Sequence, residues 1–91
     1  MKKDKFDFKV TEIISKLYDW CKKENYSINQ YGKYSVFLNI KDKDITNIKE
    51  RISDYLITKL NTTKKKIKKL FSILVMDDRI YILFKAPSQI L

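Results

Sequence analysis

Hydrophobic residues recur along the chain with a helical spacing in two segments. In residues 10–24, apolar side chains three and four positions apart form one stripe, which predicts an amphipathic helix. Residues 45–60 repeat this spacing and predict a second helix, with Asp44 as its N-cap and Asn61 as its end. The two stripes consist of Val10, Ile13, Ile14, Leu17 and Cys21, and of Ile45, Ile48, Ile52, Tyr55, Leu56 and Leu60.

Two other segments have the patterns of β-hairpins. Apolar and polar residues alternate through residues 26–41, and Tyr31-Gly32 is the predicted turn because glycine enters positive φ freely. Residues 70–76 and 79–86 are apolar at nearly every position and predict two strands around Asp77-Asp78. Runs of this kind indicate strands that are covered on both faces, or strands whose second face meets a partner.

Residues 5–10 fit either of two elements. Phe6, Phe8 and Val10 alternate with polar residues like a short strand, whereas Phe6 also continues the stripe of the first helix. A strand here gives the order βαββαββ, a ferredoxin-like βαββαβ plus one strand, and its absence gives αββαββ.

Both orders predict the same class of fold, a single α+β domain over residues 1–91. It should have an antiparallel sheet of three to five strands, with two helices packed on one face. The predicted core consists of Val10, Ile13, Ile14, Leu17, Val36, Leu38, Ile48, Ile52, Leu56, Ile73, Val75, Ile80 and Ile82.

The composition changes this picture mainly through charge. The chain has 91 residues and a formal net charge of +9, from 20 basic and 11 acidic residues. Such a field attracts nucleic acid, anionic lipid or an acidic protein. Only Arg51 and Arg79 are arginine, and lysine-rich composition is typical of an A/T-rich coding sequence. The placement of the lysines is therefore more informative than their number.

The sequence lacks the residues that most catalytic sites need. It has no histidine and a single cysteine, Cys21, which excludes Ser-His-Asp and Cys-His arrangements and structural zinc sites. The pairs Asp77-Asp78 and Asp42/Asp44 are better interpreted as turn and capping residues than as metal ligands. We predict that the protein is not an enzyme and has no catalytic residues, metal or cofactor.

The ends and the apolar runs of the sequence bear on localisation. The charged N-terminus is not followed by the apolar region of a signal peptide. No apolar run approaches the roughly 18 residues that a membrane span needs. We therefore expect a cytoplasmic protein that does not bind membranes.

Residues 59–69 contain six lysines and no acidic residue. If residues 63–70 are helical, Lys64 lies over Lys68 and Lys65 over Lys69, and a bound polyanion would relieve their repulsion. The alternative is a solvated connector that only Ile67 anchors. The candidate nucleic-acid-binding residues are Lys64, Lys65, Lys66, Lys68 and Lys69, followed by Arg79, Tyr81 and Lys85.

Aromatic residues near these and other cations suggest single-stranded nucleic acid, whose bases stack on rings. Tyr31, Tyr34 and Phe37 lie near Lys33 and Lys41 in the sequence, and Tyr81 lies between Arg79 and Lys85. If both strands turn these residues away from the helices, the open sheet face is basic and aromatic. RRM-type domains bind RNA on such a face, but residues 31–38 do not match their RNP1 pattern.

The leading functional hypothesis is therefore non-catalytic nucleic-acid binding, mainly through phosphate. The alternative is a protein-binding module or inhibitor, of the kind encoded by phages, plasmids or viruses, that uses the apolar 70–86 hairpin. That partner is an acidic protein or, in a homodimer, a second copy of the chain. Charge on the sheet face favours nucleic acid, and an exposed apolar sheet face favours a protein partner.

Overall fold

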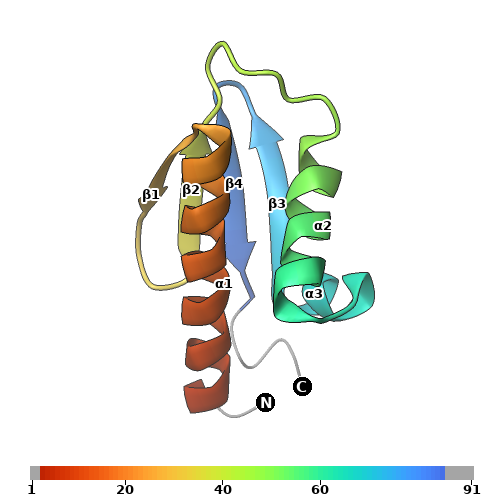
Figure 1. Ribbon diagram of the computed structural model, residues 1–91. Coiled ribbons are helices and arrows are strands. Elements are labelled where there is room, and N and C mark those ends of the chain that lie inside the picture. The colour runs from red at the N-terminus through yellow and green to blue at the C-terminus, as the bar shows by residue number, and fades with distance from the viewer. Residues whose placement is uncertain (1–2, 86–91) are drawn as a thin grey trace.

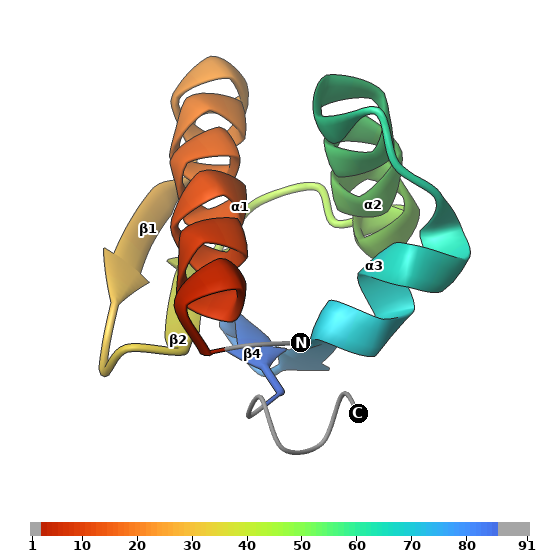
Figure 2. The same ribbon diagram turned by 90° about the horizontal axis from the view of Figure 1, so that it is seen from below.

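The structure is a computed structural model that describes residues 3–85, and it confirms the predicted α+β class (Figure 1). Its elements are α1 (Lys3–Glu24), β1 (Ser27–Gln30), β2 (Ser35–Asn39), α2 (Ile48–Leu60), α3 (Lys64–Leu70), β3 (Phe71–Met76) and β4 (Arg79–Phe84). The four strands form one antiparallel sheet in the order β1-β2-β4-β3. α1 and α2 lie on one face of this sheet, and α3 lies beside α2 (Figure 2).

The N-terminal segment is helical, so the order that begins with a strand is wrong. α1 starts seven residues before the predicted helix and includes Phe6 in its buried stripe, at 0% exposure. Phe8 is 69% exposed. A strand would turn both rings to the same side, whereas the helical period separates them.

The first hairpin has the predicted position and turn. Ser27 pairs with Asn39 and Gln30 with Val36, and Gly32 lies in the connecting loop with φ of 70°. β1 is an edge strand with one neighbour, β2, and β2 joins it to β4 at the centre of the sheet.

The second helix starts later than the pattern predicts, because Asp44 does not cap it. The Asp44 carboxylate accepts a hydrogen bond from the Thr46 backbone N–H at 3.0 Å, in a turn before the helix. This bond lowers the pKa of Asp44. Asn47 is the N-cap, in a left-handed conformation and without a side-chain capping bond. The predicted end at Asn61 is confirmed, since its N–H bonds to the Ile57 carbonyl.

The second hairpin is confirmed, but one of its faces is left open. Burial alternates along both strands: Ile80, Ile82 and Phe84 are buried, whereas Leu74 and Met76 are exposed. The helices cover only the inner face, so the interpretation that the chain itself covers both faces is wrong. Leu70 ends α3 rather than beginning β3.

The core lies between the inner sheet face and the two long helices. Eleven of the thirteen predicted core residues are buried, and Ile73 and Val75 are only partly buried because β3 is an edge strand. The buried residues that were not in the predicted core are Phe6, Trp20, Cys21, Ile40, Ile67, Phe71 and Phe84. No helix within residues 3–85 is long and apolar enough to cross a bilayer.

Candidate nucleic-acid interface

The predicted lysine cluster forms a short helix, α3, fixed to the domain at both ends. The Thr63 hydroxyl accepts a hydrogen bond from the Lys66 backbone N–H at 3.3 Å and caps the N-terminus. Ile67 is 3% exposed and anchors the middle of the helix in the core. The connector is thus helical, with Ile67 as its buried anchor, while its five lysines are exposed to solvent as the alternative interpretation expected.

The five lysines of α3 extend in different directions. At 100° per residue they cover about 200° of the helix circumference, and Ile67 and Leu70 occupy the remaining inner side. Lys64 and Lys68 line a pocket toward α2, whereas Lys66 and Lys69 line a second pocket toward α1 together with Lys9. The cluster thus presents positive charge on two sides of one helix.

Lys85 joins this cluster but also has a structural role. Its ammonium group donates a hydrogen bond to the Lys68 carbonyl at 3.0 Å, and its backbone N–H bonds to the Leu70 carbonyl at 2.9 Å. A cation that bonds to the last carbonyls of a helix caps its C-terminus. Lys85 therefore turns toward α3 and not onto the open sheet face.

Arg79 and Tyr81 lie on that open face, apart from α3. β4 runs from Arg79, at the hairpin turn, to Phe84, opposite the start of β3. The two ends are five positions apart along the strand, which corresponds to about 17 Å. The eight predicted site residues therefore form two groups, a basic group at α3 and a pair on the sheet.

An aromatic cluster of Tyr31, Phe37 and Tyr81 occupies the middle of the open face. Phe37 and Tyr81 are direct partners on the two central strands, with ring centroids 6.1 Å apart. Tyr31 lies 5.7 Å from Phe37 and 6.2 Å from Tyr81. The Arg79 guanidinium lies 4.5 Å from the Phe37 centroid, in cation–π contact. This arrangement brings one cation and three rings together.

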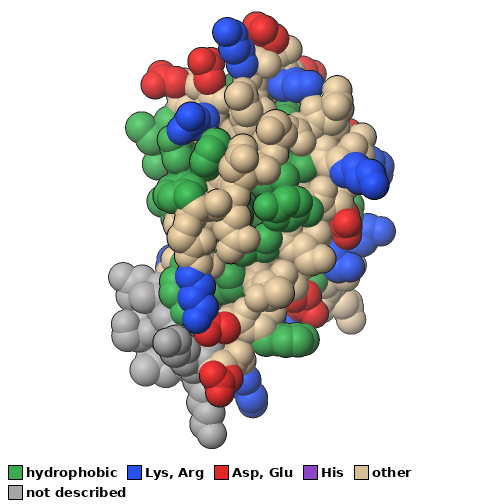
Figure 3. Space-filling view, turned by 90° about the vertical axis from the view of Figure 1, so that its left-hand side faces the viewer, with side chains coloured by type: hydrophobic (Ala, Val, Ile, Leu, Met, Phe, Trp, Pro, Cys, Tyr) green, Lys and Arg blue, Asp and Glu red, His purple; other side chains and the backbone are tan. Residues whose placement is uncertain are grey.

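The rest of the open face combines three apolar residues with serine and asparagine side chains and carries little charge. Leu74, Met76 and Leu83 are 43%, 50% and 37% exposed and lie beside the aromatic cluster on β3 and β4. Figure 3 views the molecule from the β1 side and shows hydrophobic side chains along the margin that the helices leave uncovered. Arg79 is the one charged residue among the outward-facing strand positions of residues 3–85. The expected basic and aromatic face is thus aromatic but almost uncharged, and it is apolar on β3 and β4.

Tyr34, Lys41 and the aspartate pairs do not contribute to this face. The Tyr34 ring packs against Phe6 on the helical side, and Lys41 follows the end of β2. Asp77, with φ of 46°, belongs to the β3–β4 turn. Within the described residues 3–85, no group of three or more cysteine, aspartate or glutamate side chains is arranged to hold a metal ion.

Sequence reasoning missed two parts of the candidate interface. The sequence predicts an interface on the apolar 70–86 hairpin but does not single out Leu74, Met76 and Leu83, although their alternation with inward-facing residues is a detectable signal. Lys49 and Ser53 of α2 line the same pocket as Lys64 and Lys68. No local sequence pattern indicates that proximity, which arises from the packing of α2 beside α3.

Comparisons with known proteins return no match: no family model, no curated protein and no solved structure is significantly similar to the chain.

Proposed function

We propose that the protein binds single-stranded nucleic acid without catalysing a reaction on it. Bases stack on the aromatic cluster, and lysines of α3 neutralise phosphates of the same strand. The observation that carries the proposal is the direct pairing of Phe37 with Tyr81 on a sheet face that no helix covers. Stacking on such rings tolerates any base, since every base has a π-face.

The charge distribution supports the same function. The Arg79 guanidinium contacts the Phe37 ring, and α3 adds five lysines at the start of β3. No acidic residue is among the outward-facing strand positions within residues 3–85, and the nearest aspartates, Asp77 and Asp78, lie in the turn beside Arg79. Arg79 and α3 lie at opposite ends of the β3–β4 hairpin, so a strand that contacts both runs along the hairpin and around its end.

The test is fluorescence anisotropy with labelled single- and double-stranded oligonucleotides at about 50 and 200 mM salt. We expect tighter binding of the single strand and a steep loss with salt. Five phosphate contacts on a single strand correspond to a slope of about −3.5 in log K against log salt.

A lysine variant connects this binding to α3. Replacing Lys64, Lys65, Lys68 and Lys69 with Gln should weaken binding and flatten the salt slope by about 3 without unfolding the protein. Unchanged binding by that variant would show that α3 is not part of the interface. Absence of binding by the natural chain at low salt would refute the proposed function.

A second candidate function is protein recognition through the same open face, including pairing with a second copy of the chain. The exposure of Leu74, Met76 and Leu83 on one hairpin favours it, because a contiguous apolar surface of this kind marks interaction sites. Sedimentation velocity over a range of protein concentrations tests the homodimer. A concentration-dependent dimer that Leu74→Ser and Leu83→Ser abolish would favour this function over nucleic-acid binding.

A further inference from the structure

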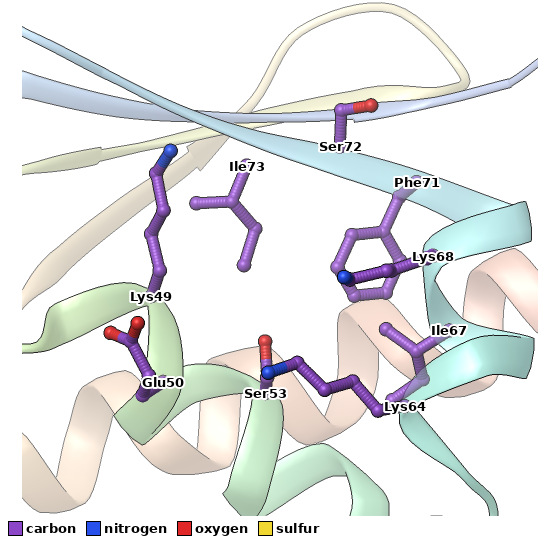
Figure 4. Close-up of a pocket in the computed structure, with 9 residues that line it drawn as sticks. All are labelled: Lys49, Glu50, Ser53, Lys64, Ile67, Lys68, Phe71, Ser72 and Ile73. Carbon is purple, nitrogen blue, oxygen red and sulfur yellow. The ribbon is translucent and has the colours of Figure 1, made fainter.

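A pocket between α2, α3 and the start of β3 gathers lysines from two helices. Its volume is about 470 Å³, within the range of small-ligand sites. Lys64 and Lys68 extend into it from α3, and Lys49 extends from α2 toward β3 (Figure 4). Lys49 thus lines the same hollow as two lysines that follow it by 15 and 19 positions in the sequence.

The pocket has a net positive charge that nothing in the described chain neutralises fully. Glu50 is the one acid that lines it, so three lysines and one glutamate leave a formal charge of +2. Within residues 3–85, Lys49, Lys64 and Lys68 form no ion pair with a carboxylate. Positive charges that line one hollow without a carboxylate partner favour the binding of an anion there.

The inner wall of the pocket is apolar. Ile67, Phe71 and Ile73 form it, and the Ser53 hydroxyl lies among the polar lining groups. Ligand sites typically combine an apolar wall with a few polar groups that fix orientation. A ligand that fits must therefore carry both a concentrated negative charge and a flat or apolar portion.

We propose that this pocket binds a terminal phosphomonoester on a nucleoside-sized group. A phosphomonoester carries a charge of about −1.5 to −2 at pH 7, which matches the +2 of the pocket, whereas an internal phosphodiester carries only −1. The phosphate contacts the three lysines, and the attached nucleoside packs on the apolar wall. The proposal rests on the proposed function, because it assigns the pocket to the phosphorylated end of a bound strand.

The first experiment compares oligonucleotides of one sequence with a 5′-phosphate, a 3′-phosphate or only hydroxyl ends, all with an internal label. We expect a terminal phosphate to strengthen binding by about tenfold, as for hydrogen bonds between charged groups. Equal affinity of the three oligonucleotides overturns the proposal and leaves the proposed function standing.

Lysine variants of α2 and α3 separate the effect of the pocket from that of overall charge. Lys49→Gln, Lys64→Gln and Lys68→Gln together should abolish the preference for the terminal phosphate. The matched control replaces Lys65, Lys66 and Lys69 with Gln, which removes the same charge outside this pocket. The control should lose overall affinity but retain the preference. Loss of the preference in both variants would show that it depends on net charge alone, and would overturn the proposal that the pocket binds the terminal phosphate.

Glu50→Gln gives a test that misfolding cannot imitate. Removing the one negative charge in the pocket should strengthen binding of the phosphorylated oligonucleotide more than that of the hydroxyl-ended one. Asp54→Asn, on an exposed position of the same helix, is the control and should not change this ratio. Equal effects of the two substitutions on the ratio contradict the proposal.

A free mononucleotide distinguishes failure of the pocket from failure of the proposed function. If no oligonucleotide binds, the proposed function fails and the pocket is tested with AMP and adenosine by NMR titration. Saturable chemical-shift changes at Lys49, Lys64 and Lys68 with AMP but not with adenosine support a nucleotide site. These changes should be lost in the triple pocket variant. Identical spectra with AMP and adenosine overturn it.

Discussion

The Tyr34 hydroxyl donates a 2.7 Å hydrogen bond to the carboxylate of Asp7, which precedes it by 27 residues. Lys33 contacts the other oxygen of the same carboxylate at 2.8 Å. The bond joins the first turns of α1 to the β1–β2 loop. It also raises the pKa of Tyr34, chiefly because the hydrogen bond to Asp7 favours the protonated hydroxyl.

Tyr34→Phe should therefore lower the stability of the domain at neutral pH and have less effect at high pH. A group whose pKa is raised by folding stabilises below its unfolded pKa, about 10 for tyrosine, and loses that contribution as the pH rises through the folded pKa. The measurement is urea unfolding of both proteins at pH 7 and near pH 11. The difference in unfolding free energy between the two proteins at each pH is compared, because the other tyrosines titrate in both proteins and cancel. A difference between the two proteins that grows with pH would contradict this assignment.

Ile67→Ala should detach the lysine helix from the core. The side chain is almost fully buried, so the loss of contacts and the resulting cavity should cost about 2–5 kcal/mol of unfolding free energy. Chemical denaturation measures this loss. Lys66→Ala, on the neighbouring exposed position, should change stability by less than about 0.5 kcal/mol. Similar losses in the two variants would show that Ile67 is not the anchor.

Thr63→Ala tests the cap of the same helix. The Thr63 hydroxyl accepts from the Lys66 N–H, and its removal should cost about 1 kcal/mol. Thr58→Ala, on the exposed side of α2, is the control and should be neutral or slightly stabilising because alanine favours helix. Hydrogen exchange should show faster exchange confined to α3 in the Thr63 variant, and exchange as slow as in the natural chain would contradict the role of the cap.

Phe37→Ala and Tyr81→Ala test the aromatic cluster. If bases stack on these rings, each substitution should weaken binding of single strands by roughly fivefold to 150-fold, from about 1–3 kcal/mol per ring. Tyr18→Ala removes a tyrosine from α1 that is more exposed than Phe37 or Tyr81 and should leave binding unchanged. Anisotropy titration at constant salt is the measurement. Weakening by Tyr18→Ala as large as that by Phe37→Ala would point to aromatic residues in general rather than to this face.

Cys21 should be unreactive in the folded protein. Burial raises its pKa to about 12, so the reactive thiolate is scarce at neutral pH. Alkylation by iodoacetamide should proceed only at the rate of unfolding, and full modification in urea is the control. Stability should also fall as the pH rises above about 9, because the thiol then ionises in the unfolded chain but not in the folded one. Rapid modification under native conditions would contradict this burial.

The sequence predicted the elements whose signals are local. Gly32, Asn61 and Asp77-Asp78 mark turns and a helix end through their own backbone preferences, and all three lie where expected. The local sequence does not decide between strand and helix at residues 5–10, because Phe6 fits both patterns. The choice was settled by burial of Phe6 against the rest of the core.

The candidate site was predictable in composition but not in arrangement. The lysines of α3 and the ring of Tyr81 are evident in the sequence. Their separation on the molecule depends on the register of β4 against its neighbours. Lys85 shows why the arrangement could not be predicted. Strand alternation predicts that its side chain faces outward, but its ammonium group donates a hydrogen bond to the Lys68 carbonyl at the end of α3.

The junction between α3 and β3 contains no linker, since Leu70 ends the helix and Phe71 begins the strand. The Phe71 N–H bonds to the Ile67 carbonyl, and the Lys85 N–H bonds to the Leu70 carbonyl. A lysine-rich tail without such bonds would lose backbone entropy on ordering around an anion. In α3 that loss has already occurred on folding, so a bound anion would restrict only the side chains. The backbone of the lysine helix is thus pre-organised for binding.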